Sequence, residues 1–379
     1  MPETLSAPAP QAVGDESWTR REIFQQPDTL RATQAMLRAA QPAIDAFLRP
    51  LLAREDLRIV LTGAGTSAFI GDSIAAWLAT LLGRPIEAVA TTDIVSAPAL
   101  HLRDVPTLFV SFGRSGNSPE SVAAVDLVDA LVGTAYHLVI TCNTDGQLAR
   151  RTGSDTHVVV LPEATHDRAF AMTSSFTAMM FAALSIFTGI ATMDARADTI
   201  ARAVAGTLSA ADAPMAALAG RDFERVVYLG SGPFKGLARE AALKLLELSD
   251  GALVTAFDTA LGFRHGPKTI VTDRTLVVVF VSNDRLTRRY DLDIIAELRA
   301  DGRCGAVLAI SAQPIDGDAL HVPGLATATD ADLLFPFIVP AQLFGLHASL
   351  RLGLTPDTPN ASGTVNRVVQ GVRIHAIEA

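Results

Sequence analysis

The feature that most constrains the fold is an internal repeat with a spacing of about 167 residues. Short apolar runs that begin at Arg58 and Thr107 are echoed by runs that begin at Arg225 and Thr275. Each run is followed by a segment with helical periodicity, and strands that alternate with helices form parallel sheets covered on both faces. The sequence therefore predicts an α/β protein of two tandem domains, each a doubly wound parallel sheet flanked by helices.

The repeat predicts four parts along the chain. They are an N-terminal tail with helices (1–44), a first domain (45–200), a second domain (215–350) and a C-terminal tail over the site (351–379). We expect disorder in residues 1–15 and a helix that begins near Ser17. The Ala-rich stretch 194–221 is expected to form a connecting helix.

A hydroxyl-rich segment, 111–121, predicts a phosphate-binding loop in the first domain. It lies between an apolar run and a predicted helix, and a helix N-terminus offers free N–H groups and a favourable dipole to an anion. The hydroxyls of Ser115 and Ser118 and the amide of Asn117 add donors. The alternative is a helix N-cap followed by a polar turn.

A second loop, 63–67, contains Gly65, Thr66 and Ser67 and also follows a predicted strand. In a parallel sheet the two loops share one edge, where ligands bind. The matching loop of the second domain, 281–286, lacks the Ser-Gly-Asn-Ser pattern, so phosphate binding is assigned to the first domain. The glycines do not extend into Gly-x-Gly-x-x-Gly, which argues against a dinucleotide site.

The second domain carries a cluster of charges at helical spacing. Glu240, Lys244 and Glu247 occupy positions i, i+4 and i+7, which places them on one helical face. The residues between them are largely apolar, so the helix should be buried on most sides, where charges must pair or line a cavity. A surface ladder of ion pairs is the alternative interpretation.

A histidine in a predicted turn completes the set of candidate catalytic residues. His265 lies in the segment 262–268, whose Gly-Pro step favours an exposed turn. Histidine titrates near neutrality and can both donate and accept a proton. The alternative is a loop histidine without a catalytic role.

Composition limits the partners. The net charge of −9 argues against a nucleic-acid or acidic-membrane partner but allows a small anionic substrate. Cys142 and Cys304 lie in apolar runs, so we expect free thiols in a reducing compartment, the cytoplasm. The N-terminus lacks the pattern of a signal peptide, and no apolar run is expected to span a membrane, 172–193 coming closest.

These motifs, in this order, resemble those of sugar isomerase (SIS) domain proteins, such as the isomerase half of glucosamine-6-phosphate synthase. A closer resemblance is to the tagatose-6-phosphate ketose/aldose isomerase family, whose members are thought to act as galactosamine-6-phosphate deaminases. It covers about 17–374 and is carried by four segments: 19–27, 63–72, 174–176 and 362–370. The resemblance implies that each predicted domain is an SIS domain.

The resemblance also implies roles for individual residues. Thr66, Ser67, Ser115 and Ser118 match phosphate-binding positions, whereas Gly113 replaces a serine and Arg114 a glutamine of the synthase. Thr173 and Ser174 match a loop that contacts the sugar. Glu247 matches the catalytic base, Lys244 its partner, and His265 a ring-opening residue supplied by a neighbouring subunit. The synthase has a catalytic lysine in its C-terminal tail, and the nearest match here is Gln370.

The expected activity is therefore conversion of galactosamine 6-phosphate to tagatose 6-phosphate and ammonia, in a homodimer with shared active sites. No metal or organic cofactor is required by this chemistry. Three alternatives stay open: glucosamine-6-phosphate deamination, plain ketose/aldose isomerisation, and a sugar-phosphate-sensing regulator. We disfavour the regulator because the segment before Leu57 is too short for a DNA-binding domain and the chain is acidic.

Overall fold

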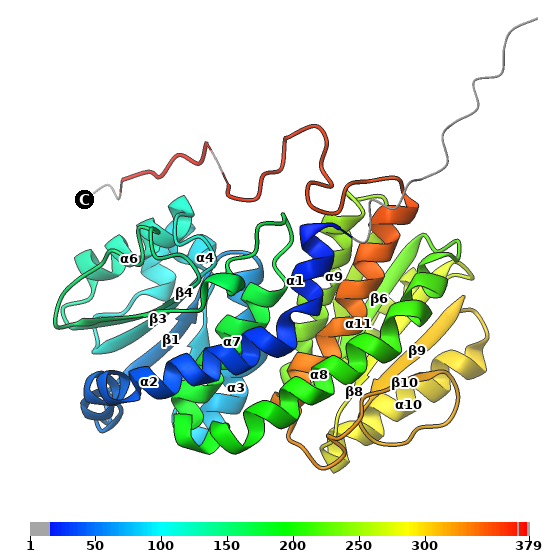
Figure 1. Cartoon of the computed structure of the whole chain (residues 1–379), viewed down its shortest axis with the longest axis horizontal. Coiled ribbons are helices and arrows are strands. Elements are labelled where there is room, and N and C mark those ends of the chain that lie inside the picture. The colour runs from blue at the N-terminus through cyan, green and yellow to red at the C-terminus, as the bar shows by residue number, and fades with distance from the viewer. Residues whose placement is uncertain (1–15, 370, 377–379) are drawn as a thin grey trace, which may run out of the picture.

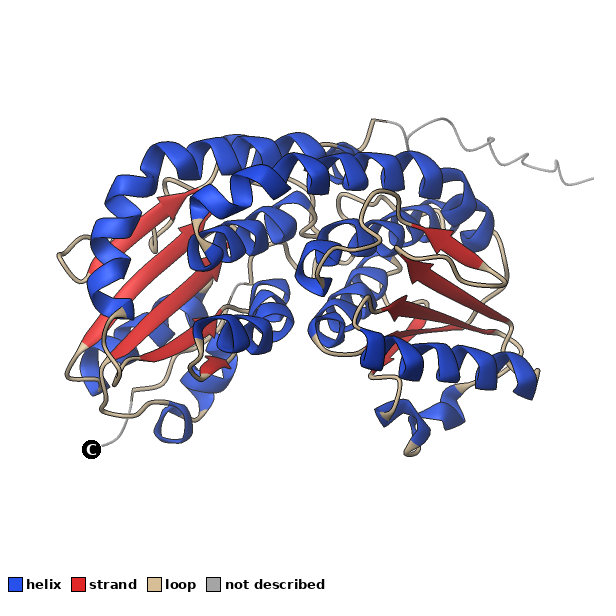
Figure 2. Ribbon diagram, turned by 90° about the horizontal axis from the view of Figure 1, so that it is seen from below, coloured by secondary structure: helices blue, strands red, loops and turns tan. Residues whose placement is uncertain are grey.

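The structure is a computed structural model that describes residues 16–369 and 371–376. Residues 1–15, for which we expected disorder, and Gln370 lie outside the described residues. The described chain forms two halves, each with a five-stranded sheet and helices on both of its faces (Figure 2).

All the strand pairs are parallel, and the two sheets have the same topology. The first sheet has the order β2-β1-β3-β4-β5 and the second the order β10-β9-β8-β6-β7, which is the same arrangement read from the other end. The strands of the first sheet are β1 (Arg58–Thr62), β2 (Ile86–Ala88), β3 (Thr107–Gly113), β4 (Ala135–Thr141) and β5 (Thr156–Val160). Those of the second are β6 (Arg225–Gly230), β7 (Val254–Asp258), β8 (Thr275–Val281), β9 (Ala306–Ser311) and β10 (Ala319–His321). The predicted duplication of a doubly wound α/β unit is confirmed.

Helices connect the strands within each half. In the first half they are α3 (Thr66–Leu82), α4 (Thr91–Ser96), α5 (Pro98–His101), α6 (Pro119–Leu131), η1 (Glu163–Thr165) and α7 (Ser174–Thr188). In the second half they are α9 (Pro233–Leu248), η2 (Gly262–Arg264), η3 (Pro267–Ile270), α10 (Arg285–Asp301) and α11 (Asp330–Arg351). Three further helices precede or link the halves: α1 (Trp18–Phe24), α2 (Gln26–Leu52) and α8 (Ile190–Ala219).

Helix packing joins the two halves. The long helices α2 and α8 pack along each other, α11 packs on α8 and α9, and α3 packs on α9 (Figure 1). The α3–α9 contact needs a glycine, because a Cβ on Gly236 would lie 2.5 Å from the backbone nitrogen of Ser73. The amino-terminal parts of α3 and α9 and the loops before them therefore have a fixed relation, which sets the geometry of the site.

Helix α11 is a core helix. It is the one helix among the described residues that is long and apolar enough to cross a membrane, and 89% of its most apolar window is buried inside the protein. Phe337 on this helix stacks on Phe234 of α9 and on Phe280 of β8. Our expectation that 172–193 comes closest to a membrane span was wrong, because 330–351 is the longer apolar helix; its hydropathy reflects packing between the halves.

Candidate active site

The two predicted polar loops lie side by side at the carboxyl edge of the first sheet. Thr62 at the end of β1 is in register with Ser111 of β3, and β3 ends two residues later at Gly113, so both loops begin at the same edge of the sheet. Strand order reverses between β1 and β3, the point at which open parallel sheets bind ligands. A cavity of about 220 Å³ lies at this point.

Three groups of residues, from five separate segments of the chain, line this cavity. The first group is the pair of loops, which contribute Ala64, Gly65, Thr66, Ser67, Phe112, Gly113, Arg114, Ser115, Gly116, Ser118 and Ser121. The second is Leu243 and Glu247 of α9, together with Phe170 and Met172 from the loop before α7. The third is the tail segment Val365, Asn366, Arg367, Val368 and Val369.

Backbone geometry explains why the two loops suit an anion. Gly65 caps α3 with a φ of 55°, and Gly116 turns its loop with a φ of 63°, a region that favours glycine. Ser118 occupies the N-cap position of α6, but it makes no side-chain cap hydrogen bond. Its Oγ donates to Oγ of Ser121 at 2.6 Å instead. The N-terminal amides of α6 are thus not occupied by the Ser118 hydroxyl.

Asn117 braces this loop and does not line the cavity. Its Oδ1 accepts from the backbone N–H of Gln147 at 2.9 Å. Asn143 donates from Nδ2 to the carbonyl of Ser115 at 2.8 Å, which supports the loop from the same side. Asn117, which we expected to donate to a phosphate, therefore holds the loop in place from behind.

Glu247 reaches the cavity from the second half, and Lys244 lies behind it. The Lys244 side chain is fully buried and forms ion pairs with Glu240, at 3.5 Å, and with Glu247. Burial lowers the pKa of Lys244, but the attraction of the two carboxylates outweighs this and raises its pKa overall. Burial raises the pKa of Glu240 to about 8. The surface-ladder interpretation is wrong, because the cluster is inside the protein.

Arg114 closes one wall of the cavity. Its guanidinium donates to the carbonyls of Ala169 and Phe170, both at 3.0 Å, and to the carbonyl of Arg367 at 2.8 Å. Burial, and then repulsion from Arg367, lowers its pKa to about 10, so it stays charged at neutral pH. Arg114 therefore ties the loop before α7 and the C-terminal tail together.

Thr173 and Ser174 follow Met172 in the sequence, but unlike Met172 they do not line the cavity. The backbone N–H of Thr173 donates to Asp167 Oδ2 at 2.8 Å, and Ser174 Oγ donates to Asp167 Oδ1. Gln25 also donates to Ser174 Oγ, at 2.9 Å. These contacts fix the start of α7, and Met172, two residues before this helix, lines the cavity.

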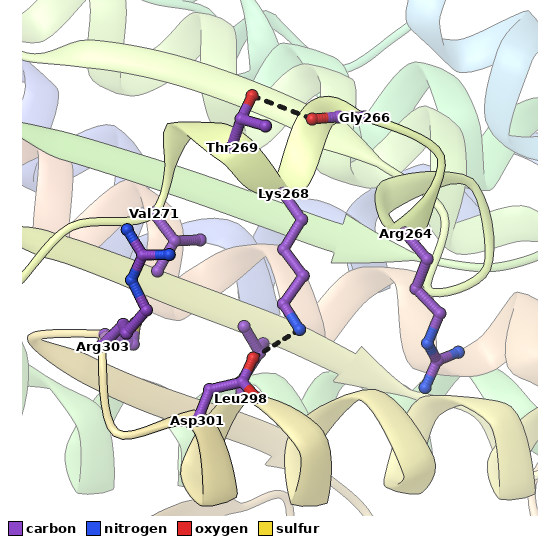
Figure 3. Close-up of a pocket in the computed structure, with 9 residues that line it drawn as sticks. Arg264, Gly266, Lys268, Thr269, Val271, Leu298, Asp301 and Arg303 are labelled. Carbon is purple, nitrogen blue, oxygen red and sulfur yellow. Dashed lines mark hydrogen bonds and ion pairs between the residues drawn. The ribbon is translucent and has the colours of Figure 1, made fainter.

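His265 is exposed and does not line the cavity. A single chain therefore does not bring it to Glu247. Behind its loop lies another cavity of about 300 Å³ (Figure 3). Two of the cations there, Arg264 and Lys268, already pair with Glu297, and Lys268 also pairs with Asp301. This second cavity is accordingly less suited to a phosphate than the first.

In the second half, two carboxylates fill the position that matches the phosphate loop. Asp330 accepts from Ser282 Oγ at 2.6 Å and from the backbone N–H of Asn283 at 2.9 Å. Asp291 accepts from the backbone N–H of Ser282 at 3.0 Å and from Ser231 Oγ at 3.1 Å. The repeated fold thus places hydroxyl and N–H donors at the matching edge of both sheets, and in the second half these donors bind the protein's own carboxylates.

Comparison with known proteins agrees with this arrangement. A model of the SIS domain matches residues 51–189. A Streptomyces coelicolor protein that carries the name AgaS is 52% identical over 368 residues, 95% of this chain and 95% of the relative.

The chain belongs to the AgaS family of SIS-domain proteins.

An Escherichia coli relative named D-galactosamine-6-phosphate deaminase AgaS is 47% identical over an alignment of 388 positions that covers 100% of this chain and 100% of the relative. The crystal structure of tagatose-6-phosphate ketose/aldose isomerase from Escherichia coli has a TM-score of 0.89 and 44% identity. It covers 98% of this chain and 100% of its own.

Two features of this AgaS-family site were not among our expected site residues. Arg367 lines the cavity from the tail, and its guanidinium donates to the carbonyl of Asp167 from Nε at 3.1 Å. Glu22 of α1 accepts from the backbone N–H groups of Arg168 and Ala169. Burial, and then repulsion from Asp167, raises the pKa of Glu22 to about 8. Both residues fall within segments that carry the family resemblance, which was the available signal.

Proposed function

We propose that this protein converts galactosamine 6-phosphate to tagatose 6-phosphate and ammonia. One observation carries the proposal: a single cavity is lined both by the hydroxyl-rich loops of the first half and by the carboxylate of Glu247 from the second. The names of full-length relatives, one a galactosamine-6-phosphate deaminase and one a tagatose-6-phosphate isomerase, support the same substrate class.

Phosphate binding provides orientation. Thr66, Ser67, Ser115 and Ser118 line the cavity and lie at or next to the N-termini of α3 and α6. Binding energy at the phosphate, remote from the reacting carbons, holds C1 and C2 of the sugar near the base at the other end. Arg114 holds the loop before α7 and the C-terminal tail together, and its positive charge lies at the cavity, where it favours an anionic substrate.

Glu247 is the proposed base. In the open-chain sugar it removes the proton from C2, and the electrons move towards O1 to give an enolate-like intermediate. The ammonium group of Lys244, in contact with Glu247, stabilises negative charge at this end and holds the carboxylate in place. Delivery of the proton to C1 leaves an imine at C2, which water hydrolyses to the ketose and ammonia.

His265 is proposed to open the sugar ring in the cavity of a neighbouring subunit of a homodimer. Its exposure, and its position outside the cavity of its own chain, support this assignment. The same part of the second half has exposed apolar side chains, Phe257 (38% exposed) and Leu261 (46%), which a second copy would cover. Cys142 and Cys304 are both free, which supports a cytoplasmic location.

The test is incubation of the purified protein with galactosamine 6-phosphate, glucosamine 6-phosphate and tagatose 6-phosphate, with separate assays of ammonia and ketose. We expect ammonia and ketose in equal amounts from the galactosamine ester, at a higher kcat/KM than from the glucosamine ester. Interconversion of hexose phosphates without ammonia release from either amino sugar would show instead a plain ketose/aldose isomerase.

A further inference from the structure

The loop that carries His265 is fixed to the helix behind it by one acidic side chain. We infer that Glu297 of α10 is a positioning residue for the reaction, because it binds the two cations on either side of His265. The inference rests on the role proposed above for His265.

The contacts are divided between the two carboxylate oxygens. Oε2 of Glu297 accepts from Nε of Arg264 at 2.7 Å, and Oε1 pairs with Nζ of Lys268. Lys268 also pairs with Asp301, one helical turn further along α10, as Figure 3 shows. The chain on each side of His265 is thus bound to the same helix.

The rest of the loop explains why such an anchor is needed. Phe263, two residues before His265, is buried in the core and is 1% exposed, whereas 265–267 are exposed. Gly266 turns the chain with a φ of 118°. Because glycine has no Cβ, the backbone at this position can adopt more conformations than it could with another residue. Among the described residues, the His265 ring has no hydrogen bond or ion pair to hold it. Its placement therefore depends on the backbone on both sides.

This arrangement suits a side chain that acts in another subunit. A loop that must be ordered each time substrate binds loses conformational freedom, and small errors in placement slow a proton transfer. A loop that is already fixed from behind leaves the ring free on its exposed face and avoids both losses. The four charged side chains of the network are 26% to 40% exposed, so they add little to global stability, and their removal should affect catalysis more than unfolding.

The experiment compares Glu297→Gln with His265→Asn and with the double variant, using ammonia release from galactosamine 6-phosphate. Glu297→Gln keeps the size of the side chain but removes its charge. We expect kcat to fall about tenfold or more with KM little changed, the scale set by misplacement of a catalytic group. We expect the double variant to be no slower than His265→Asn alone, because Glu297 acts only through the histidine. The matched control is Glu224→Gln, which breaks a comparable ion pair with Arg274 elsewhere in the second half and should leave kcat unchanged.

The possible results distinguish a failure of the positioning role of Glu297 from a failure of the catalytic role proposed for His265. Wild-type activity of His265→Asn would refute the proposed role of the histidine. A slow His265→Asn beside a fully active Glu297→Gln would overturn the positioning role alone. Independent, multiplicative losses in the double variant would also overturn it, since Glu297 would then act by another route. Should Glu297→Gln not fold, Lys268→Gln breaks the same contact and takes the same double-variant test.

Discussion

Removing the charge of Lys244 should destabilise this protein far more than the same change elsewhere on the helix. Lys244 is fully buried on α9 between Glu240 and Glu247. Glu240 is also fully buried, and its Oε1 lies 3.5 Å from Nζ of Lys244. The ammonium of Lys244 is the cation nearest to Glu240 and also pairs with Glu247, so Lys244→Met leaves two acidic side chains of α9 without their cation.

The magnitude follows from this burial. Breaking a buried ion pair by removing one partner costs about 3–5 kcal/mol of unfolding free energy, whereas replacing both partners by apolar groups is often neutral. The pKa of Glu240 is raised to about 8, so at pH 7 this carboxyl is mostly protonated, which places the cost at the low end of that range. We therefore expect about 3 kcal/mol for Lys244→Met at pH 7, and a cost closer to zero for Glu240→Leu combined with Lys244→Met.

The assay is urea unfolding at pH 7, followed by circular dichroism, for both variants and for Lys235→Met. Lys235 lies on the same helix but is exposed, so its change to Met should shift the unfolding free energy by less than about 0.5 kcal/mol. A Lys244→Met protein as stable as Lys235→Met would refute the inference that the charge cluster is buried. A double variant no more stable than Lys244→Met would show that lost packing, not the unpaired carboxylate, is the cause.

Three further predictions concern the site. Ser115→Ala should weaken binding of the phosphosugar by roughly 1–3 kcal/mol, because a donor to a charged group is lost; unchanged affinity in titration calorimetry would remove this loop from the site. Glu247→Gln should stop exchange of the C2 proton with deuterated solvent, and mixing it with His265→Asn should restore activity if the two residues come from different subunits; no recovery after verified subunit exchange would contradict a shared site. The third concerns Glu22, whose pKa is raised to about 8 by burial and then by Asp167. Its stabilising contribution is complete below the ordinary value of 4.5 and is lost as the pH rises through about 8, so Glu22→Gln should lessen the decline in stability over this interval. A wild-type pH profile for Glu22→Gln, measured by thermal unfolding, would show that the carboxyl is not buried as described.

The sequence by itself determined the architecture and one side of the site. Apolar runs and helical periodicity are local properties, and the rule that parallel strands place their following loops at one edge brings 63–67 and 111–121 together. Helical spacing likewise places Glu240, Lys244 and Glu247 on one face without knowledge of the rest of the fold. These predictions depend on residues close in sequence or on the common geometry of doubly wound sheets.

Only the tertiary structure decided how the cavity is closed. The bond from Arg114 to the carbonyl of Arg367 joins residues 253 positions apart, and the bond from Arg367 to the carbonyl of Asp167 joins residues 200 positions apart. Glu22 holds Arg168 across 146 positions. No periodicity links such segments, because each contact depends on where the packing of α2, α8 and α11 places the chain ends. The same packing, and not the helix itself, decides that Lys244 is buried while Lys235 is exposed.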